Sequence, residues 1–394
     1  MSNHNHPNLR FTAALRARSN STLLRALAVV ATLVTAAASV NAQNYTVTEV
    51  GTLEGKNESF GTAINNNGEV AGTTIAGPGT EAAFRFHAKT GIEPVDYTSK
   101  TGVSRAFGIN DSGAVVGDST FGADSTTKAV PVNRAALFAN GTVRDLGTLP
   151  KIGAFSRAND INASGFVVGF AGPTLDSQNS RAFIWTTNSG MTDLGTLGGT
   201  YAQATAINNS SFIVGHSQTR PTRAGGGETH AFIYQYLSTF SDGPTSAMTD
   251  LGTLGGGYSY ATDVNDSNQV VGYSTIDAEG HFHAFLHDGK AMQDLGSLGT
   301  PGNKTDQSFG LGVNKSGEVV GYSFLPSADQ VAFVFRGGKM WDLNTLIGSA
   351  VKEYYLYSAE GINDQGQIIA TAFVPASNTF RAVILTPESV VNTK

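Results

Sequence analysis

The sequence predicts an all-β fold, a seven-bladed β-propeller with four antiparallel strands in each blade. Three observations predict it: a turn that recurs seven times, a strand pattern that repeats with the turn, and a repeat divided between the chain's ends. Successive turns of the form Asn-x-x-Gly, or close variants, lie 45 to 57 residues apart. Repetition at this period indicates a solenoid, a propeller or another array. The turns begin at Asn65, Asn110, Asn162, Asn208, Asn265, Asn314 and Asn363.

The fifth repeat shows the four strands, a to d, that we expect in every blade. Strand a is Ser259–Val264, and strand b is Gln269–Ser274, which is rich in β-branched residues. Strand c is His283–His287, and strand d is Ala291–Gly296. Short turns join them into an antiparallel meander. Beyond residue 42 there is no long apolar pattern at helical spacing, so we expect few helices.

Two positions stay small in every repeat, which indicates tight packing between sheets. The second residue of strand c is always alanine, from Ala83 to Ala382. One position in strand a is always Gly or Ala, from Gly61 to Ala359. Such crowding is expected on the innermost strand of a radial array, and four-stranded sheets repeated around an axis form a β-propeller.

The two ends of the mature chain complete each other. The last repeat has strand a at Ser358–Asn363, strand b at Gln367–Ala370 and strand c at Arg381–Leu385, but no strand d. The segment Tyr45–Leu53 matches a strand d and its exit, as at Met248–Leu254. We therefore expect the N-terminal strand to pair into the last blade, which closes the ring and removes two exposed edges. An open solenoid gives no reason to divide a repeat in this way.

The first 42 residues have the pattern of a secretory signal peptide. Four arginines and no acidic residue precede the apolar run Ala26–Val40, and the segment ends in Val40-Asn41-Ala42. The run is shorter than the ~20 residues that span a bilayer, although an uncleaved anchor is the alternative. We expect cleavage after Ala42 and a single propeller domain over residues 43–394. The protein should then be secreted or extracellular, with the periplasm as the alternative destination.

The composition of the mature chain excludes several partners. Without the leader's four arginines, 21 basic residues face 31 acidic ones, a net charge of −10. Nucleic acids are bound by basic surfaces, so we expect no nucleic acid partner. No later segment is apolar enough to enter a membrane, and the absence of cysteine means folding without disulfides. We expect a monomer without a cofactor.

Three motifs recur along the mature chain. Asp-Leu-Gly-Thr-Leu-Gly-Gly occurs at Asp193–Gly199 and Asp250–Gly256, and His-Ala-Phe at His230–Phe232 and His283–Phe285. The core Asn-x-x-Gly-x-Val-Val-Gly ends at Gly117 in the second repeat. Together they resemble the HAF-repeat family of extracellular proteins, which implies export and a repeat fold but no established activity or catalytic residue. The motif's histidine is not a required ligand, because three repeats replace it with Arg134, Arg181 and Arg381.

The longest and most variable loops should share one face. In a propeller the b–c and d–a loops emerge together, and binding usually resides in loops on a rigid scaffold. We expect the long b–c loops to cover residues 118–133, 170–180, 216–229 and 273–282. This loop-rich face is where we expect a glycan, a peptide or a cell-surface component to bind.

A ring of residues at the start of strand a, near the axis, differs between blades. Its members are Phe60, Arg105, Arg157, Gln203, Tyr260, Phe309 and Ser358. Tyrosines would supply aromatic contact with a ligand and arginines polar contact. The predicted ligand-binding residues are Arg105, Arg157, Gln203, Tyr201, Tyr258, Tyr260 and Phe309. Side chains that merely fill the channel mouth are an equally good interpretation.

Two carboxylates raise the alternative of a propeller hydrolase or lyase. Asp160 and Asp263 occupy the same column, where the other repeats have Gly or Ala. Two acids at this inner position could act as an acid–base pair. Alternatively, each carboxylate bonds neighbouring backbone or water. A purely structural surface protein is a third interpretation.

The sequence does not predict a metal site. His281 and His287 would lie about 20 Å apart along a strand, which is too far to share an ion. His281 and His283 alone are too few ligands for structural zinc. The Asn-Asp-x-Gly turns lack the ligand pattern of a calcium loop.

Overall fold

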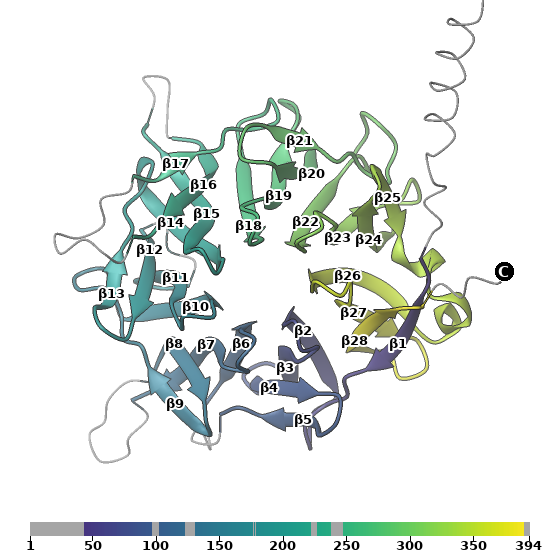
Figure 1. The fold of residues 1–394 in the computed structure, drawn as a ribbon, viewed down its shortest axis with the longest axis horizontal. Coiled ribbons are helices and arrows are strands. Elements are labelled where there is room, and N and C mark those ends of the chain that lie inside the picture. Colours follow the sequence, from purple (N-terminus) through teal and green to yellow (C-terminus); the bar gives the residue numbers. More distant parts are fainter. Residues whose placement is uncertain are drawn as a thin grey trace, which may run out of the picture. The chain divides into compact units, whose positions relative to one another are not determined.

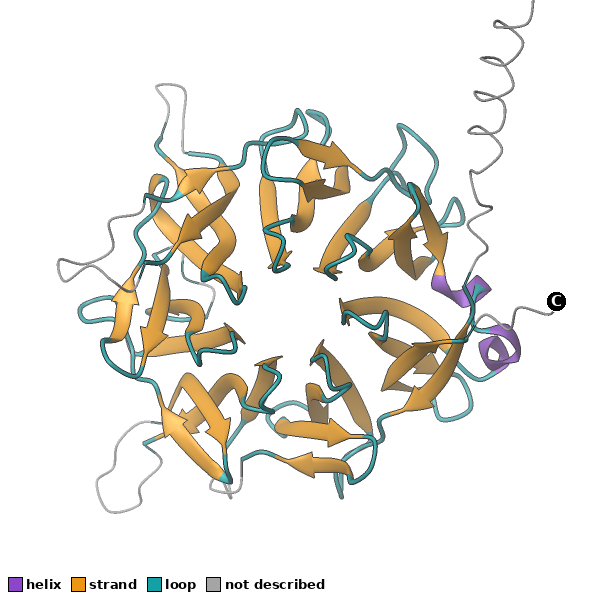
Figure 2. Cartoon of the chain, in the orientation of Figure 1, coloured by secondary structure: helices purple, strands orange, loops and turns teal. Residues whose placement is uncertain are grey.

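The computed structural model describes residues 43–96, 102–122, 131–175, 177, 179–221, 227–237 and 247–389. The expected signal peptide lies outside the described residues. From residue 43 onward, seven four-stranded antiparallel sheets stand in a ring (Figures 1 and 2). The predicted all-β, seven-bladed propeller is therefore confirmed.

In each blade the strands run from a, nearest the axis, to d at the rim (Figure 1). Blade 1 has β2 (Glu58–Ile64), β3 (Val70–Ile75), β4 (Ala82–His87) and β5 (Gly91–Pro94). Blade 2 has β6 (Ser104–Ile109), β7 (Val115–Phe121), β8 (Val132–Ala139) and β9 (Thr142–Asp145). Blade 3 has β10 (Phe155–Ile161), β11 (Val167–Gly172), β12 (Arg181–Thr186) and β13 (Gly190–Asp193). Blade 4 has β14 (Gly198–Ile207), β15 (Phe212–Thr219), β16 (Thr229–Gln235) and β17 (Thr249–Asp250).

The remaining blades follow the same order. Blade 5 has β18 (Ser259–Val264), β19 (Val270–Thr275), β20 (Phe282–His287) and β21 (Met292–Asp294). Blade 6 has β22 (Ser308–Val313), β23 (Val319–Phe324), β24 (Gln330–Arg336) and β25 (Lys339–Asp342). Blade 7 has β26 (Tyr355–Ile362), β27 (Ile368–Val374), β28 (Thr379–Pro387) and β1 (Tyr45–Glu49). The helical segments among the described residues are two short 3₁₀ turns, η1 (Leu343–Thr345) and η2 (Gly348–Lys352), and no described helix is long and apolar enough to cross a membrane.

The N-terminal strand closes the ring as predicted. β1 pairs antiparallel with β28, in a register from Tyr45 opposite Pro387 to Glu49 opposite Val383. The Nε atom of Arg381 lies 3.0 Å from Oε1 of Glu49, which adds an ion pair across this junction. Both ends of the described chain therefore belong to the same blade.

The small columns pack between blades, as the sequence predicts. Ser156, at the start of its strand a, accepts a hydrogen bond from the backbone N of Ala135 in blade 2 (2.9 Å). This bond joins strand c of one blade to strand a of the next. A Cβ added to Gly61 would come within 2.4 Å of the Ile369 side chain. The alanine column of strand c is buried as well, with Ala83 and its equivalents at most 1 % exposed.

Every innermost strand carries a β-bulge at the same position. A bulge inserts one unpaired residue and re-aims its neighbours. In blades 3 and 5 the bulge brings the pairs Asn159–Asp160 and Thr262–Asp263 into the lining of one cavity in the channel. The bulge thus explains why two acids can face the axis from a crowded strand.

Candidate functional site

The central channel has three levels: a narrow end formed by the a–b turns, a middle level with carboxylates, and a mouth beside the b–c and d–a loops. Each level is built by residues at equivalent positions of the seven blades. The repeated residues build the narrow end. The residues that differ between blades build the mouth.

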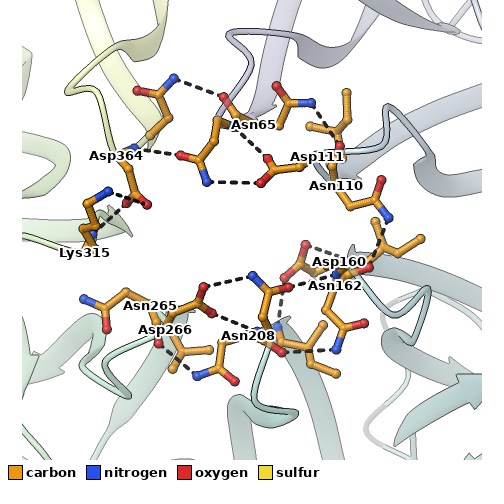
Figure 3. A pocket seen from close by; sticks show the side chains of 18 of the residues that line it. Asn65, Asn110, Asp111, Asp160, Asn162, Asn208, Asn265, Asp266, Lys315 and Asp364 are labelled. Carbon is orange, nitrogen blue, oxygen red and sulfur yellow. Dashed lines mark hydrogen bonds and ion pairs between the residues drawn. The ribbon is translucent and has the colours of Figure 1, made fainter.

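At the narrow end, the seven turn asparagines form a closed ring of hydrogen bonds, part of which Figure 3 shows. Each Nδ2 donates to the backbone O of the asparagine in the next blade, over 2.9 to 3.4 Å, and Asn363 completes the circle by donating to Asn65. Each Oδ1 accepts two backbone N–H groups of its own turn, as Asn162 does from Ser164 and Phe166 (both 3.0 Å). The side chains are only 3 to 7 % exposed. The ring therefore fastens all seven blades together.

A second set of bonds surrounds this ring at the surface. Asp111, Asp266 and Asp364 each accept the backbone N–H of the residue that follows the turn asparagine in the preceding blade (2.9 to 3.0 Å). The cavity between these turns has a volume of about 180 Å³. The polar groups around this cavity hydrogen-bond one blade to the next, so the narrow end has a structural role.

At the middle level, both predicted carboxylates line one cavity of about 180 Å³. Asp160 accepts backbone N–H groups from Ile161 (2.8 Å) and from Ile207 of the next blade (2.9 Å). Asp263 does the same with Val264 (2.7 Å) and Val313 (2.9 Å). Each carboxylate therefore bridges two blades through both of its oxygens.

Burial is the largest cause of the pKa shifts of Asp160 and Asp263. Burial, together with repulsion from Asp263, raises the pKa of Asp160 to about 7. The two backbone hydrogen bonds that Asp160 accepts lower its pKa but do not offset these causes. Burial likewise raises the pKa of Asp263. Raised pKa values are what a channel enzyme would need. The same values follow from burying a structural carboxylate.

Sequence analysis missed a third acid, Glu360, which stands at the bulge of blade 7 and lines the same cavity. Its Oε1 accepts hydrogen bonds from the hydroxyls of Ser358 and Thr371, whereas its Oε2 is buried without a hydrogen-bond partner. Burial raises the pKa of Glu360 to about 7. The sequence could have revealed Glu360, because blades 1, 4 and 5 have threonine at the equivalent bulge position and blade 7 has an acid.

We expect Glu360→Gln to stabilise the protein at alkaline pH and to have little effect at acidic pH. The fold binds the Glu360 proton more tightly than the unfolded chain does. Its stabilising contribution is therefore complete below a pH of about 4.5 and is lost as the pH rises through about 7. At about 1.4 kcal/mol per pKa unit, the free energy of unfolding should rise by up to about 3 kcal/mol at pH 8. Urea denaturation at pH 4, 6 and 8 measures this, and a difference that does not vary with pH would contradict it.

At the mouth, the two predicted arginines share one buried carboxylate. Nη1 of Arg105 lies 3.4 Å from Asp118, and Nε of Arg157 lies 3.0 Å from it. Asp118 is 0 % exposed, and burial raises its pKa even though both arginines lower it. Arg105 also lies 3.5 Å from Glu81. We call these four residues the arginine cluster.

On the opposite side, aromatic rings of blades 4 to 6 form a continuous chain of contacts. Ring centroids of successive partners lie 4.7 to 6.3 Å apart, and the rings meet across the seams between blades, as His216 meets Tyr260 and Tyr273 meets Phe309. All of these side chains are half-buried. We call this set the aromatic arc: Tyr201, His216, Tyr260, Tyr273, Phe282, Phe309, Tyr322 and Phe324.

The structure therefore brings most predicted ligand-binding residues together. Tyr201, Tyr260 and Phe309 lie in the aromatic arc. Gln203 is paired in register with His216, at the edge of the arc. Tyr258 is 47 % exposed and lies outside the chain of ring contacts.

The predicted starts of three b–c loops are wrong, because Asp118, Phe170 and His216 lie inside β7, β11 and β15. Tyr273 lies inside β19, which agrees with the predicted strand b at Gln269–Ser274 and not with the predicted loop 273–282. Each of these four residues pairs with a member of the strand-a ring. Tyr201, another of the predicted ligand-binding residues, lies in β14. The mouth is thus built on paired strands. The strand-b residues of the mouth were missed as candidates. They could have been found from the sequence, because the position directly after the repeated glycine of strand b varies between blades.

Beside the arginine cluster, a groove of about 410 Å³ opens between blades 2 and 3. Phe155, Leu175 and two prolines line it, and Arg105 belongs to both the groove and the cluster. The mouth therefore continues outward as an accessible, mostly apolar surface.

The histidine of the His-Ala-Phe motif has a packing role. Nδ1 of His283 lies 2.8 Å from Asp294 of strand d, and Nδ1 of His230 lies 2.8 Å from Asp250. In blade 2, Arg134 makes the equivalent pair with strand d at 2.9 Å. The motif thus links strands c and d. Over the described part of the chain, no group of three or more His, Cys, Asp or Glu side chains could hold a metal ion.

Among solved structures, a puromycin hydrolase S511A mutant complexed with PGG is similar, with a TM-score of 0.52 and 11 % identity over 83 % of this chain and 53 % of the hydrolase. This chain thus spans about half of the hydrolase. TolB from Acinetobacter baumannii (TM-score 0.38, 11 % identity, 79 % of this chain and 60 % of TolB) and an ulvan lyase of polysaccharide lyase family PL25 (0.40, 11 %, 89 % and 97 %) are more distant. At these identities the hydrolase supports the fold alone.

A comparison with curated proteins gave no significant match. A family model described as "Protein of unknown function (DUF3466)" matches residues 87–251 and again residues 200–386, as expected for a chain with internal repeats. This match does not confirm the HAF-repeat assignment, which stays a resemblance. The two matches together span most of the chain, and the protein therefore belongs to the DUF3466 family.

Proposed function

We propose that this protein is a binding module, exported to the cell envelope or beyond, that recognises a glycan, a peptide or a surface partner through the channel mouth. The aromatic arc is the observation that carries the proposal. Partly exposed aromatic side chains supply large contact areas at low entropic cost, and their polar tips add hydrogen bonds. The rings of the arc are half-buried, so part of each remains accessible to a ligand.

The alternative of a channel hydrolase or lyase has one observation in its favour, since Asp160 and Asp263 line one cavity and have raised pKa values. Against it, both oxygens of each carboxylate already accept backbone N–H groups that join two blades. A general acid or base must reach the substrate's proton. The binding function is therefore the better supported of the two.

We expect the mature protein, residues 43–394, to bind ligands on a glycan and peptide array, and Tyr260→Ala to weaken that binding tenfold or more. Loss of a central aromatic anchor at an interface costs about 2 kcal/mol or more. Asp263→Asn should keep the binding. Tyr236→Ala is the matched control, because the backbone N of Tyr236 donates to Ser211 in an a–b turn, at the opposite end of the channel. An array without any bound ligand, or equal loss in both tyrosine variants, would contradict the proposal.

A further inference from the structure

The chemistry of the channel mouth selects one class of ligand, and this inference rests on the proposed binding function. We propose that the aromatic arc recognises a short run of uncharged sugar rings, that is, a neutral glycan. The inference follows from the side-chain types in the arc, from the charge balance of the arginine cluster, and from the carboxylates in the channel below.

The arc consists of flat aromatic rings, five of which have a polar edge, and it contains no aliphatic side chain. A pyranose ring has the complementary form, an apolar C–H face and a rim of hydroxyl groups. Aromatic faces cover the C–H surface, and tyrosine hydroxyls reach the rim. Gln203, half-buried at the edge of the arc, offers an amide that both donates and accepts.

The arc is uncharged over the physiological pH range. Burial lowers the pKa of His216 to about 4, and its Nε2 lies 2.9 Å from the hydroxyl of Tyr201. Burial raises the pKa of Tyr201 to about 12 and also raises those of Tyr260, Tyr273 and Tyr322. The hydroxyls therefore keep their protons and remain hydrogen-bond donors. The surface offers hydrogen bonds but no charge to pair with a charged ligand.

The arginines on the other side of the mouth do not supply a net positive charge. The formal charges of Arg105 and Arg157 are balanced by Asp118 and Glu81, at 3.0 to 3.5 Å. Beneath the mouth, Asp160, Asp263 and Glu360 line the channel. An acidic polysaccharide approaching the mouth therefore meets balanced charges and then acidic groups whose negative charge grows as the pH rises through about 7. Uncharged chains avoid this unfavourable field.

The test compares two sets of hexasaccharides by isothermal titration calorimetry with the mature protein at pH 7. One set is neutral (glucose, mannose, galactose and xylose chains), and the other is acidic (galacturonate, glucuronate, mannuronate and guluronate chains). We expect at least one neutral chain to bind tenfold or more tightly than any acidic chain. Its affinity should change less than threefold between 50 and 500 mM NaCl, because no ion pair contributes.

Variants identify the surface. Phe309→Ala should weaken binding of the neutral chain tenfold or more, and Phe309→Leu, which keeps the apolar volume and the fold, should weaken it as well. Tyr236→Ala, the control outside the mouth, should change it less than threefold. Tighter binding of acidic chains would overturn the neutral-glycan inference while the mouth stays a binding site. Peptide binding that needs Phe309 would overturn it in the same way. If no mouth variant changes the affinity, or if no probe binds at all, the proposed function is overturned as well.

Discussion

Deletion of Asn44–Leu53 is expected to abolish cooperative folding of the propeller. The segment contains β1, the outer strand of blade 7, and it buries Tyr45 (3 % exposed) and Val50 (4 %). Losing these contacts costs about 1.5 to 3 kcal/mol per buried side chain, and the ladder bonds add about 1 kcal/mol each. The sum approaches the 5 to 15 kcal/mol that typically separates a folded domain from its unfolded chain. Thermal melting of residues 43–394 and 54–394, followed by circular dichroism, measures the effect.

A circular permutant provides the matched control for the deletion. The backbone N of Glu388 donates to the O of Asn44 (2.9 Å), so strand c and the N-terminal strand already meet at a hairpin-like junction. Joining residues 43–54 after Glu388 through a short turn should restore the melting temperature to within a few degrees. If the shortened chain melts like the intact one, the closed-ring account is wrong.

Substitution of a single turn asparagine, Asn208→Ala, is expected to cost about 3 to 5 kcal/mol of unfolding free energy. Asn208 donates to Asn265 O (2.9 Å) and accepts from the backbone N of Ser210 (3.0 Å) and Phe212 (2.9 Å). Each lost bond leaves a buried partner unsatisfied, at about 1 to 3 kcal/mol. Chemical denaturation measures the loss.

The neighbouring substitution Asn209→Ala is the control, because Asn209 is exposed and its hydrogen bonds, with Ala163 and Asp266, lie at the surface. It should cost less than about 1 kcal/mol. Asn208→Asp separates the two halves of the amide, since aspartate keeps the acceptor of the turn but loses the donor to the next blade. Equal stability of all three variants and the parent would show that the asparagine ring does not hold the blades together.

The number of blades and the closure of the ring could be predicted because the same pattern recurs along the sequence. Seven copies of one pattern, with Ala83 and its equivalents held small, leave few architectures. The division of one repeat between the termini then distinguishes a closed ring from an open array. These signals are internal to the chain and depend on periodicity, which sequence inspection reads well.

The asparagine ring was harder to foresee because a turn already explains the residue. Asn at a turn is expected for its side-chain oxygen, which satisfies local backbone N–H groups. Its amide nitrogen donates to the next blade, 45 to 57 residues further along the chain in six of the seven repeats. In four repeats it also donates to a Glu or Gln side chain four residues on. The absence of Asp or Ser from all seven positions was the available signal, since neither residue supplies the same donor together with the acceptor.

Only some of the residues that form the mouth could be predicted, because local sequence does not show where strand b ends. In blade 2, propensity suggests that strand b ends at its glycine, since Asp118 is a weak strand former. Pairing with strand a decides the strand's length instead, and it places His216 opposite Gln203 and Tyr273 opposite Tyr260. Tertiary pairing of this kind is not encoded in local composition. The strand-a half of the aromatic arc was therefore predicted, and the strand-b half was missed.

We propose that ligands bind at the mouth, where the blades differ, and not at the repeated narrow end. Hydrogen–deuterium exchange of residues 43–394, with and without the tightest array ligand, locates the binding surface. We expect the ligand to slow amide exchange at the starts of β14, β18 and β22 and to leave the turns at the seven asparagines unchanged. Slower exchange confined to those turns, with none at the starts of these strands, would contradict it.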